Sequence, residues 1–323
     1  MNVFFSAEVV NDDTCYRALD EMVFHFERGR HVWDVANFED LDQSGWFQEA
    51  GRSNPRPLFE KFLRDSLLPK ERLAHSIHIT VQTTTTSDHQ LSPEDARRSL
   101  ARQVIVAVEN PHTDGCFLRA MLAAYARQDL LADENETWKL ERMGGYGEVA
   151  KVIAEVRAMS PGPVRMMVLA DSDRDYPGHE SATITKVTRS CTEAGIPFHI
   201  LEKRSIENYI PHRIWFNKGP RKNRHWIRLF WNLNQEQRDH FPIKRGLSLH
   251  MKKGSTAFKE DAKEVETLYR VVPKTHREVL RNGAGEVAHQ FTEEVITEDD
   301  INLLCPNHPN EIKELIQKLE SLI

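Results

Sequence analysis

The sequence predicts an α/β fold: a parallel-sheet core with helices on both faces, flanked by a mainly helical N-terminal region and an α-rich, basic C-terminal region. Two observations carry this prediction. Residues 104–108 are a continuous run of β-branched and apolar residues, and residues 164–170 are apolar apart from Arg165; such runs are typical of strands buried on both faces. Segments with helical patterns separate such runs, and strand–helix alternation with short loops implies a parallel sheet with right-handed crossovers.

The N-terminal region is expected to be mainly helical, and we interpret residues 1–100 as a docking or self-association region. Apolar and aromatic residues recur at helical spacing at 16–26 and again at 58–68. A strand-like run follows at 76–81. Ser92 then predicts the start of a helix, because a proline and two acidic residues come directly after it.

The sheet core is predicted to span residues 101–212, where strands and helices alternate. The expected elements are, in chain order, a strand at 104–108, a helix at 114–128, a strand at 138–140, a helix at 144–158, a strand at 164–170, a helix at 180–193 and a strand at 198–201. Ligand sites in parallel sheets of this kind lie beyond the carboxyl ends of the strands. Residues 213–323 are less regular, basic and rich in tryptophan at first, and helical at 311–322.

Size and composition indicate the class of protein. The chain has 323 residues, and an ordinary domain has about 100–200, so one large or two modest domains are expected. Hydrophobic residues make up 40% and charged residues 28%, as in soluble globular proteins. No apolar run approaches the roughly 18 residues that span a bilayer. The N-terminus lacks the basic start and apolar stretch of a signal peptide, so we expect a cytoplasmic protein without membrane contact.

The spacing of the cysteines and the distribution of charge further restrict the class of protein. The four cysteines are scattered without a C-x-x-C pair, which argues against a zinc ribbon and a disulfide framework. The net charge of −6 is unevenly distributed: residues 1–50 hold eleven acidic and three basic residues, whereas residues 203–259 hold fourteen basic and three acidic ones. The basic segment is either a surface for a nucleic-acid phosphate backbone or an ordinary solvated face.

Acidic residues follow three of the predicted strands. Glu109 follows the first strand, and Asp171 and Asp173 follow the strand at 164–170. Glu202 follows the last strand, with Glu207 shortly after it. Each acid alone could be a helix cap after a strand. Carboxylates gathered at one sheet edge repel one another unless a cation neutralises them, and oxygen ligands suit Mg²⁺ or Mn²⁺, ions that support phosphodiester cleavage.

Three motifs, in this order and spacing, resemble the TOPRIM domain shared by topoisomerases, bacterial primases and nucleases of the overcoming-lysogenization-defect (OLD) family. The motifs are Val106-Ala107-Val108-Glu109 followed by Asp114, the glycine turn Gly144-Gly145-Tyr146-Gly147, and Leu169-Ala170-Asp171-Ser172-Asp173. The run Leu201-Glu202-Lys203-Arg204-Ser205-Ile206-Glu207-Asn208-Tyr209-Ile210 is most similar to the OLD branch. The resemblance covers about residues 102–212, a third of the chain, and implies a TOPRIM-like core.

The resemblance also implies roles for the acidic residues. Glu109 would be the metal-linked acid or base of the first strand, and Asp171 and Asp173 would be catalytic residues that hold Mg²⁺ or Mn²⁺. Glu202 or Glu207 would help at a second ion. The OLD pattern usually places its second acid four residues after the glutamate, whereas here the distance is five. That acid, Asp114, is therefore either a ligand on a longer turn or a cap of the following helix.

A lysine C-terminal to the acids is also used in the OLD family, where it is suited to stabilising charge on a cleaved phosphate. We favour Lys244 as this catalytic residue over Lys252 or Lys253. The residues predicted to bind nucleic acid are Lys203, Arg204, Arg221, Lys222, Arg224, Lys252 and Lys253. The aromatic residues interleaved with them are either stacking platforms for bases or part of a core. They are Trp215, Phe216, Trp226, Phe230 and Trp231.

The leading functional hypothesis is a Mg²⁺-dependent TOPRIM nuclease, with DNA favoured over RNA as the substrate. No G-x-x-x-x-G-K-[ST] loop is present, so a separate ATPase or regulatory protein is the expected partner, and a homo-oligomer is a further expectation. Family analogy suggests an anti-phage or anti-plasmid defence effector. The alternative is a non-cleaving TOPRIM-like binding or regulatory subunit of a larger complex. The segment Gly283-Ala284-Gly285 lacks the third glycine and the preceding strand of a dinucleotide-binding fingerprint.

Overall fold

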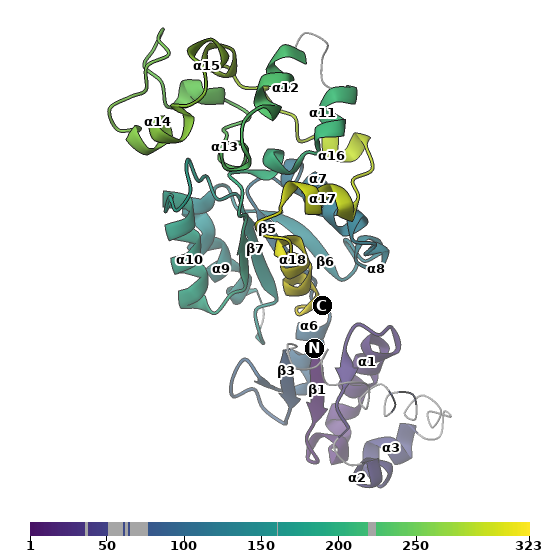
Figure 1. Cartoon of the computed structure of the whole chain (residues 1–323). Coiled ribbons are helices and arrows are strands. Elements are labelled where there is room, and N and C mark those ends of the chain that lie inside the picture. Colours follow the sequence, from purple (N-terminus) through teal and green to yellow (C-terminus); the bar gives the residue numbers. More distant parts are fainter. Residues whose placement is uncertain (36–37, 51–60, 62–63, 65–76, 160, 219–223) are drawn as a thin grey trace.

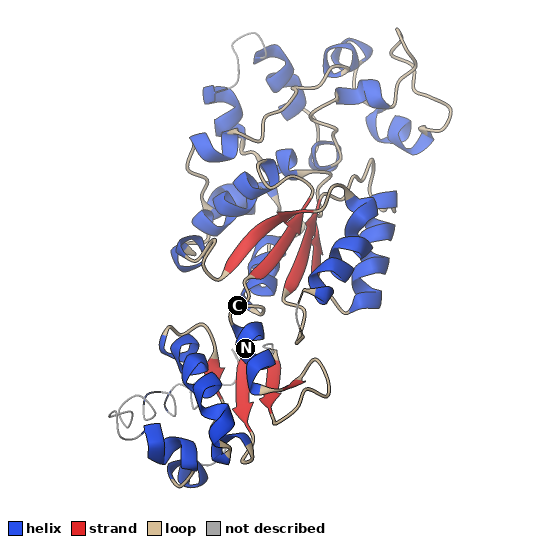
Figure 2. Ribbon diagram, turned by 180° about the vertical axis from the view of Figure 1, so that it is seen from behind, coloured by secondary structure: helices blue, strands red, loops and turns tan. Residues whose placement is uncertain are grey.

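Two parallel sheets organise the chain. The computed structural model describes residues 1–35, 38–50, 61, 64, 77–159, 161–218 and 224–323. Within these ranges the strands form two four-stranded sheets, one in the N-terminal region and one in the middle of the chain (Figures 1 and 2). The predicted α/β class with a parallel-sheet core is thereby confirmed. None of the described helices is long and apolar enough to cross a membrane.

The N-terminal sheet has the strand order β2-β1-β3-β4, and all its neighbouring strands are parallel. Its strands are β1 (Asn2–Phe5), β2 (Val32–Trp33), β3 (His78–Val81) and β4 (Gln90–Leu91), and the helices of the region include α1 (Tyr16–Glu27), α2 (Phe38–Asp42), α3 (Gly45–Ala50) and α6 (Pro93–Leu100). Leu19 and Met22 of α1 pack with Val3 and Val81 of the sheet in one buried core.

The expectation of a mainly helical N-terminal region is therefore incomplete. It includes α1 and the Ser92-capped α6, in which the Ser92 hydroxyl accepts a hydrogen bond from the Asp95 amide at 3.3 Å. It misses most of the sheet, because β1 and β2 have only four and two residues, too few to give a periodic signal. The predicted helical segment at 58–68 lies outside the described residues, apart from two isolated positions.

The second sheet has the order β6-β5-β7-β8 and is also parallel throughout. Its elements are β5 (Val104–Val108), α7 (Thr113–Ala124), α8 (Gln128–Ala132), β6 (Trp138–Arg142), α9 (Val149–Ala158), β7 (Met166–Ala170), α10 (Ala182–Ala194) and β8 (Phe198–Ile200). These bounds agree with the predicted elements to within a few residues. One difference is that the helix predicted at 114–128 is divided into α7 and α8 near Ala126, whose φ is +55°.

Alternate residues of the central strands face opposite layers of helices, which explains their continuous apolar sequence. Ala107 and Val168 share a core with α9 and α10. Val106 and Met167 face the other way and pack with Phe117 of α7. Figure 2 shows the strands between these helical layers.

The C-terminal region continues the core of the second sheet. Its elements are α11 (His212–Lys218), α12 (Arg224–Trp231), α13 (Gln235–Asp239), α14 (Lys263–Tyr269), α15 (Lys274–Leu280), α16 (Gln290–Glu293), α17 (Glu298–Leu304) and α18 (Glu311–Glu320). Figure 1 shows α11 to α17 beyond one end of the sheet, whereas α18 returns alongside the strands. Leu315 of α18 and Phe241 belong to the same buried cluster as Val106. The carboxyl edge of the sheet is therefore covered by residues from much later in the chain.

Strand order fixes where a ligand site is expected. The chain runs from β5 outward to β6 and then crosses back to β7 on the other side of β5. Adjacent connections thus leave the sheet on opposite faces. In sheets of this kind ligands bind at the crevice beyond the carboxyl ends of the two strands where the connections diverge, which are β5 and β7 here. Ala107 is paired in register with Val168, so Glu109 and Asp171 follow neighbouring strand ends.

Candidate functional site at the carboxyl edge of the second sheet

Asp171 is the first residue after β7 and the centre of the candidate site. One carboxylate oxygen accepts a hydrogen bond from the Ile206 amide at 3.0 Å. The residue keeps some exposed surface, yet protein atoms surround it closely. Burial raises the pKa of Asp171 well above its usual range, and the nearby carboxylates of Glu207, Asp114 and Asp173 raise it further. Four acids therefore act on one another at this edge.

Glu207 is the most deeply buried of these acids. It lies in the short 3₁₀ helix Ile206–Tyr209 and has no exposed surface. Among the described residues, neither of its carboxylate oxygens accepts a hydrogen bond. Its charge is met by an ion pair, in which Lys244 Nζ lies 3.1 Å from Glu207 Oε1. A buried carboxylate with so few polar partners is costly, which makes Glu207 a strong candidate for a role beyond folding.

Lys244 is placed by a close contact between two backbone segments. The Ala284 amide donates a hydrogen bond to the Ile243 carbonyl at 2.8 Å. A Cβ atom on Gly283 would lie only 2.2 Å from the Lys244 carbonyl oxygen, so only glycine fits at that position. The segment Gly283-Ala284-Gly285 is thus a packing element that holds the Lys244 turn.

The Lys244 ammonium faces both the acids and the solvent. Its side chain is 39% exposed and also lies 3.8 Å from a Glu286 oxygen. Burial alone would lower the pKa of Lys244, but the charges of Glu207, Asp171 and Glu286 raise it above its usual value. The lysine is therefore held in its charged form beside the acids.

Asp114 lies in the first turn of α7 and closes the turn that follows β5. Its Oδ2 accepts a hydrogen bond from the Asn110 amide at 3.0 Å, and Thr113 Oγ1 donates to its Oδ1 at 3.1 Å. Burial raises the pKa of Asp114. The carboxylate orders the turn between β5 and α7 rather than capping α7, because it accepts from the Asn110 amide and no side chain caps this helix.

Asp173 and Glu109 lie at the margins of the acidic site. Asp173 has a φ of +51°, a conformation that non-glycine residues rarely adopt and that is often found at functional sites. Its Oδ2 accepts a hydrogen bond from Thr183 Oγ1 at 2.8 Å, and its amide donates to the Arg204 carbonyl. Glu109 directly follows β5 and is exposed.

Glu202 is directed to a different environment. It forms an ion pair with Arg174 at 2.8 Å, and its backbone amide donates a hydrogen bond to Glu311 Oε1. These residues line a neighbouring pocket, described below. The structure therefore groups Glu207, rather than Glu202, with Asp171.

The acidic site has the donor chemistry of a Mg²⁺ site, although its ligands are not closed around one point. Among the residues that the structure describes, no three side chains of His, Cys, Asp or Glu form a ready set of metal ligands. Mg²⁺ commonly takes one or two carboxylates from the protein and keeps several waters or binds substrate phosphate. The Glu207 Oε2 atom, which accepts no hydrogen bond among the described residues, and the mutual repulsion at Asp171 fit a divalent cation at this edge of the sheet.

Two of the predicted nucleic-acid-binding residues are structural. Lys203 is 3% exposed, forms an ion pair with Asp239 and donates to the Leu304 carbonyl at 2.9 Å. Arg204 is largely buried and forms an ion pair with Asp175. Acids and carbonyls from distant parts of the chain therefore hold both charges, which does not favour the predicted contact of these two residues with nucleic acid.

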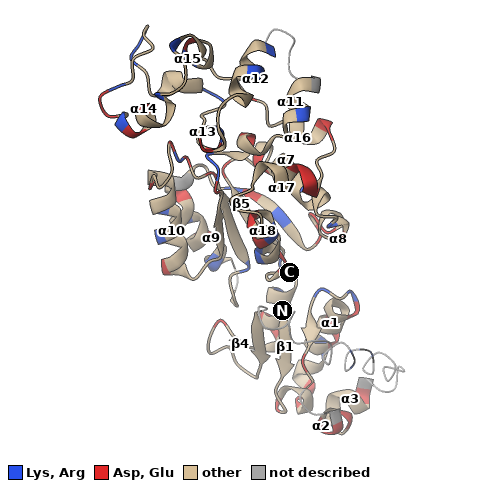
Figure 3. Ribbon diagram, in the orientation of Figure 1, with Lys and Arg blue, Asp and Glu red and all other residues tan. Residues whose placement is uncertain are grey.

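The other basic residues that were predicted to bind nucleic acid differ in exposure. Arg224, Lys252 and Lys253 are exposed, whereas Arg221 and Lys222 lie outside the described residues. Figure 3 shows further Lys and Arg residues on α11, α12, α14 and α15. The aromatic residues near them are mostly core, since Trp215, Trp226 and Phe230 are 2%, 7% and 3% exposed. These three aromatic residues are therefore part of a buried core, which is one of the two interpretations given above.

A network around Asp175 was not anticipated from the sequence. His250 Nε2 lies 3.0 Å from Asp175 Oδ1, and the Asp175 amide donates to His179 Nδ1 at 3.1 Å. Burial would raise the pKa of Asp175, but the His250 contact and the Arg204 guanidinium hold it below its usual value. In the sequence, this network was indicated only by a third acid, Asp175, in the run Asp171-Ser172-Asp173-Arg174-Asp175. Asp175 fixes the loop after β7 to the C-terminal region.

Comparisons with known proteins assign no family to the chain. It matches no protein-family model, no curated protein and no solved structure. A functional conclusion therefore depends on the chemistry of the acidic site and on the surfaces around it.

The raised pKa of Asp171 predicts that Asp171→Asn stabilises the protein at pH 8 in buffer without divalent cations. A carboxyl group whose pKa is higher in the folded protein than in the unfolded protein lowers the free energy of unfolding as pH rises. The fall begins near the pKa of the unfolded state, about 4, and continues up to the pKa of the folded state. The asparagine side chain carries no charge, so it removes this loss of stability. Its carbonyl oxygen can still accept the hydrogen bond from the Ile206 backbone amide. We expect a rise in the thermal midpoint of about 2–4 °C that shrinks as pH falls toward 4.

The matched control for this measurement is Asp88→Asn, on an exposed residue of the N-terminal region, which should leave the midpoint unchanged at both pH values. A lower midpoint for Asp171→Asn than for the control at pH 8 would contradict the inferred repulsion.

The packing at Gly283 predicts that Gly283→Ala destabilises the protein by about 1–3 kcal/mol, because the added methyl group overlaps the Lys244 backbone. Urea denaturation followed by circular dichroism measures this change. Gly147→Ala is the control, since a Cβ there meets no atom within 4 Å. Equal stability of the two variants would show that the contact does not constrain the Lys244 turn.

Proposed function

We propose that this chain is a Mg²⁺-dependent nuclease that cleaves nucleic-acid phosphodiesters at the acidic site. The observation that carries the proposal is the pair of neighbouring acids, half-buried Asp171 and fully buried Glu207, beside Lys244 at the carboxyl edge of a parallel sheet. Burial of like charges is unfavourable for folding, so their presence at a ligand-binding edge favours a functional role. The resemblance of the surrounding motifs to TOPRIM nucleases points to the same chemistry.

Each group has a distinct part in the proposed reaction. Asp171 and Asp173 would hold Mg²⁺, with exposed Glu109 and the turn acid Asp114 beside them. A bound Mg²⁺ supplies Lewis acidity toward a phosphodiester and makes a water more acidic. Lys244 is suited to stabilise negative charge on the phosphate, because its charged end is held at the crevice and is partly exposed.

Nucleic acid is the substrate class that the surface charge favours. Exposed Arg224, Lys252 and Lys253 lie in the C-terminal region that covers the carboxyl edge. Exposed basic residues attract a phosphate backbone and position it without reading sequence. DNA is proposed ahead of RNA, with cleavage controlled by a separate ATPase or regulatory partner. A cytoplasmic role in defence against phage or plasmids fits this design by analogy.

A second candidate function is a non-cleaving binding or regulatory subunit. The observation that favours it is the ion pair between Lys244 and Glu207, which already neutralises one of the acids without a metal. In that case the acidic site would have no catalytic role, and the protein would bind through its exposed basic residues alone.

Cleavage assays separate the two candidates. Purified protein is incubated with supercoiled DNA, linear DNA and RNA in Mg²⁺ or Mn²⁺, and products are resolved on gels. The nuclease proposal predicts cleavage that requires the metal and falls about 100-fold or more in Asp171→Asn, Asp173→Ala and Lys244→Ala. Asp88→Asn serves as the control and should retain full activity.

Two results would contradict the nuclease proposal at this site. Nucleic-acid binding that weakens steeply with salt, without cleavage in either metal, would support the second candidate and reject the first. Cleavage that persists unchanged in Asp171→Asn would place the activity elsewhere in the chain.

A further inference from the structure

Two acids beside the candidate metal site are already paired with basic side chains. Glu202 Oε2 lies 2.8 Å from an Arg174 nitrogen, and Glu207 Oε1 lies 3.1 Å from Lys244 Nζ. These are the two acids that the sequence suggested for a second divalent ion. A carboxylate that is paired with a basic group has less charge to offer a metal, so the two pairs bear on the number of ions that the acidic site takes.

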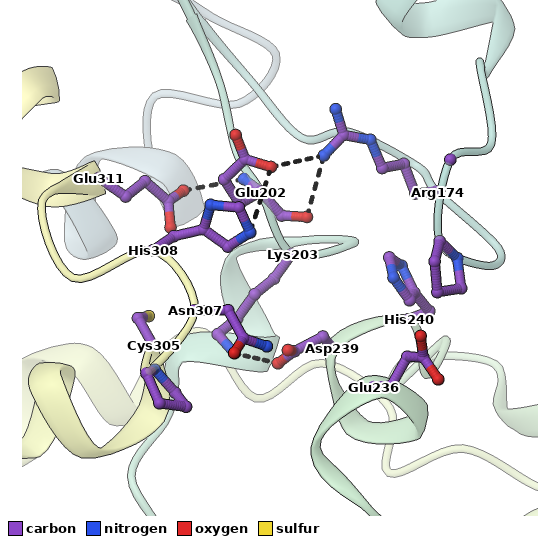
Figure 4. A pocket seen from close by; sticks show the side chains of 13 residues that line it. Arg174, Glu202, Lys203, Glu236, Asp239, His240, Cys305, Asn307, His308 and Glu311 are labelled. Atoms are coloured by element: carbon purple, nitrogen blue, oxygen red, sulfur yellow. Dashed lines mark hydrogen bonds and ion pairs between the residues drawn. The ribbon is translucent and has the colours of Figure 1, made fainter.

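Glu202 is held in a neighbouring pocket. The pocket is formed by the loops after β7 and β8, by α13 and by the residues between α17 and α18 (Figure 4). The Arg174 guanidinium donates there to the Glu202 carboxylate at 2.8 Å and to the Glu202 backbone carbonyl at 3.2 Å. His308 Nε2 lies 4.0 Å from the same carboxylate. Glu202 is therefore engaged by basic side chains of this pocket rather than by the acidic site.

Glu207 is too deeply buried for a hydrated ion. It has no exposed surface, and both of its carboxylate oxygens are buried. Mg²⁺ gives up its waters reluctantly and usually keeps several of them when a protein binds it. The side chain of Lys244 is 39% exposed and ends at Glu207, so it connects the buried carboxylate with solvent. An ion with its waters reaches Glu207 only if this lysine leaves.

The charge of Lys244 acts on more of the site than Glu207 alone. Burial raises the pKa of Asp171 and that of Asp114, and in both cases the Lys244 ammonium opposes the rise. Three carboxylates therefore share the charge of one ammonium group. A second divalent ion at this place would be repelled by that ammonium and would have to displace it.

The backbone around Lys244 restricts how far the lysine can withdraw. Besides the contact at Gly283, Gly246 has a φ of +66°, and a Cβ atom there would lie 2.4 Å from the backbone carbonyl carbon of Asn282. Both sides of this contact thus lack a side chain, and the two backbone segments lie directly against each other. The lysine turn is therefore fixed beside Glu207.

We propose that the acidic site takes a single divalent cation at Asp171, and that the Lys244 ammonium occupies the place of a second ion beside Glu207. This inference rests on the proposed function, because it concerns the same site. Two-metal sites place positive charge on both sides of the reacting phosphate. Lys244 would supply one of these charges from the protein itself, while Glu207 holds the lysine and is not a ligand of a second ion.

Mn²⁺ binding to the full chain tests the proposal. Isothermal titration calorimetry counts the ions, and electron paramagnetic resonance distinguishes an isolated Mn²⁺ from a spin-coupled pair. Wild type is expected to bind one ion more than Asp171→Asn and to show an isolated ion. Lys244→Ala is expected to bind one ion more than wild type and to show a coupled pair, because a second ion can then reach Glu207. Lys244→Arg keeps the positive charge and should bind as wild type does.

Three results would overturn the proposal. A coupled pair in wild type would show that Lys244 does not take the place of a second ion, and so would an unchanged number of ions in folded Lys244→Ala. Both of these results leave the proposed nuclease standing. Equal Mn²⁺ binding by wild type and Asp171→Asn would contradict the metal site itself, and with it the proposed function.

Further variants separate the effect of charge from a loss of folding. Lys244→Ala leaves buried Glu207 without its cation, so Mn²⁺ should raise the thermal midpoint of this variant by about 2 °C or more beyond its effect on wild type. Adding Glu207→Gln to Lys244→Ala removes both charges, and this double variant should bind no more ions than wild type. A gain of an ion in the double variant would overturn the role of Glu207. Lys186→Ala, on an exposed position of α10, is the control and should behave as wild type does. If Lys244→Ala does not fold, the spectrum of wild type decides.

Discussion

The constraint on which the candidate site depends is the placement of two neighbouring acids, half-buried Asp171 and fully buried Glu207, at the carboxyl edge of a parallel sheet. Asp171 directly follows β7, and its raised pKa reflects lost hydration together with the charges of its neighbours. Glu207 has no exposed surface and meets Lys244 at 3.1 Å. Charges buried in this way oppose folding unless a partner compensates them, so the surrounding structure has to supply one or leave room for one.

The C-terminal region supplies that compensation and closes the edge. Lys244 reaches Glu207 because the Gly283 backbone packs against the lysine turn without a side chain between them. His250 contacts Asp175 and ties the loop after β7 to the same region. The apolar cluster around Val106 extends into this region as far as α18. The acidic site is thus assembled from segments more than a hundred residues apart, and the second sheet and the C-terminal region act as one unit.

Prediction from sequence succeeded where a local pattern has one physical cause. A strand buried on both faces must be continuously apolar, so β5 and β7 were predictable, and their parallel pairing placed Glu109 and Asp171 at neighbouring strand ends. It failed where long-range contacts decide the outcome. Lys203 was expected at the surface, but Asp239 holds it in the interior. Strands β1 and β2 of the N-terminal sheet were missed because runs this short carry little periodicity, whereas β3 coincides with the strand-like run predicted at 76–81.

The most direct test of the proposed metal site is a crystal structure of the full chain grown with Mn²⁺ and measured by anomalous diffraction. The proposed site predicts an anomalous peak in the crevice between the ends of β5 and β7, within bonding distance of Asp171 and of at least one of Glu109, Asp114, Asp173 or Glu207. A well-ordered crevice with saturating Mn²⁺, no anomalous density and Lys244 still paired with Glu207 would contradict it.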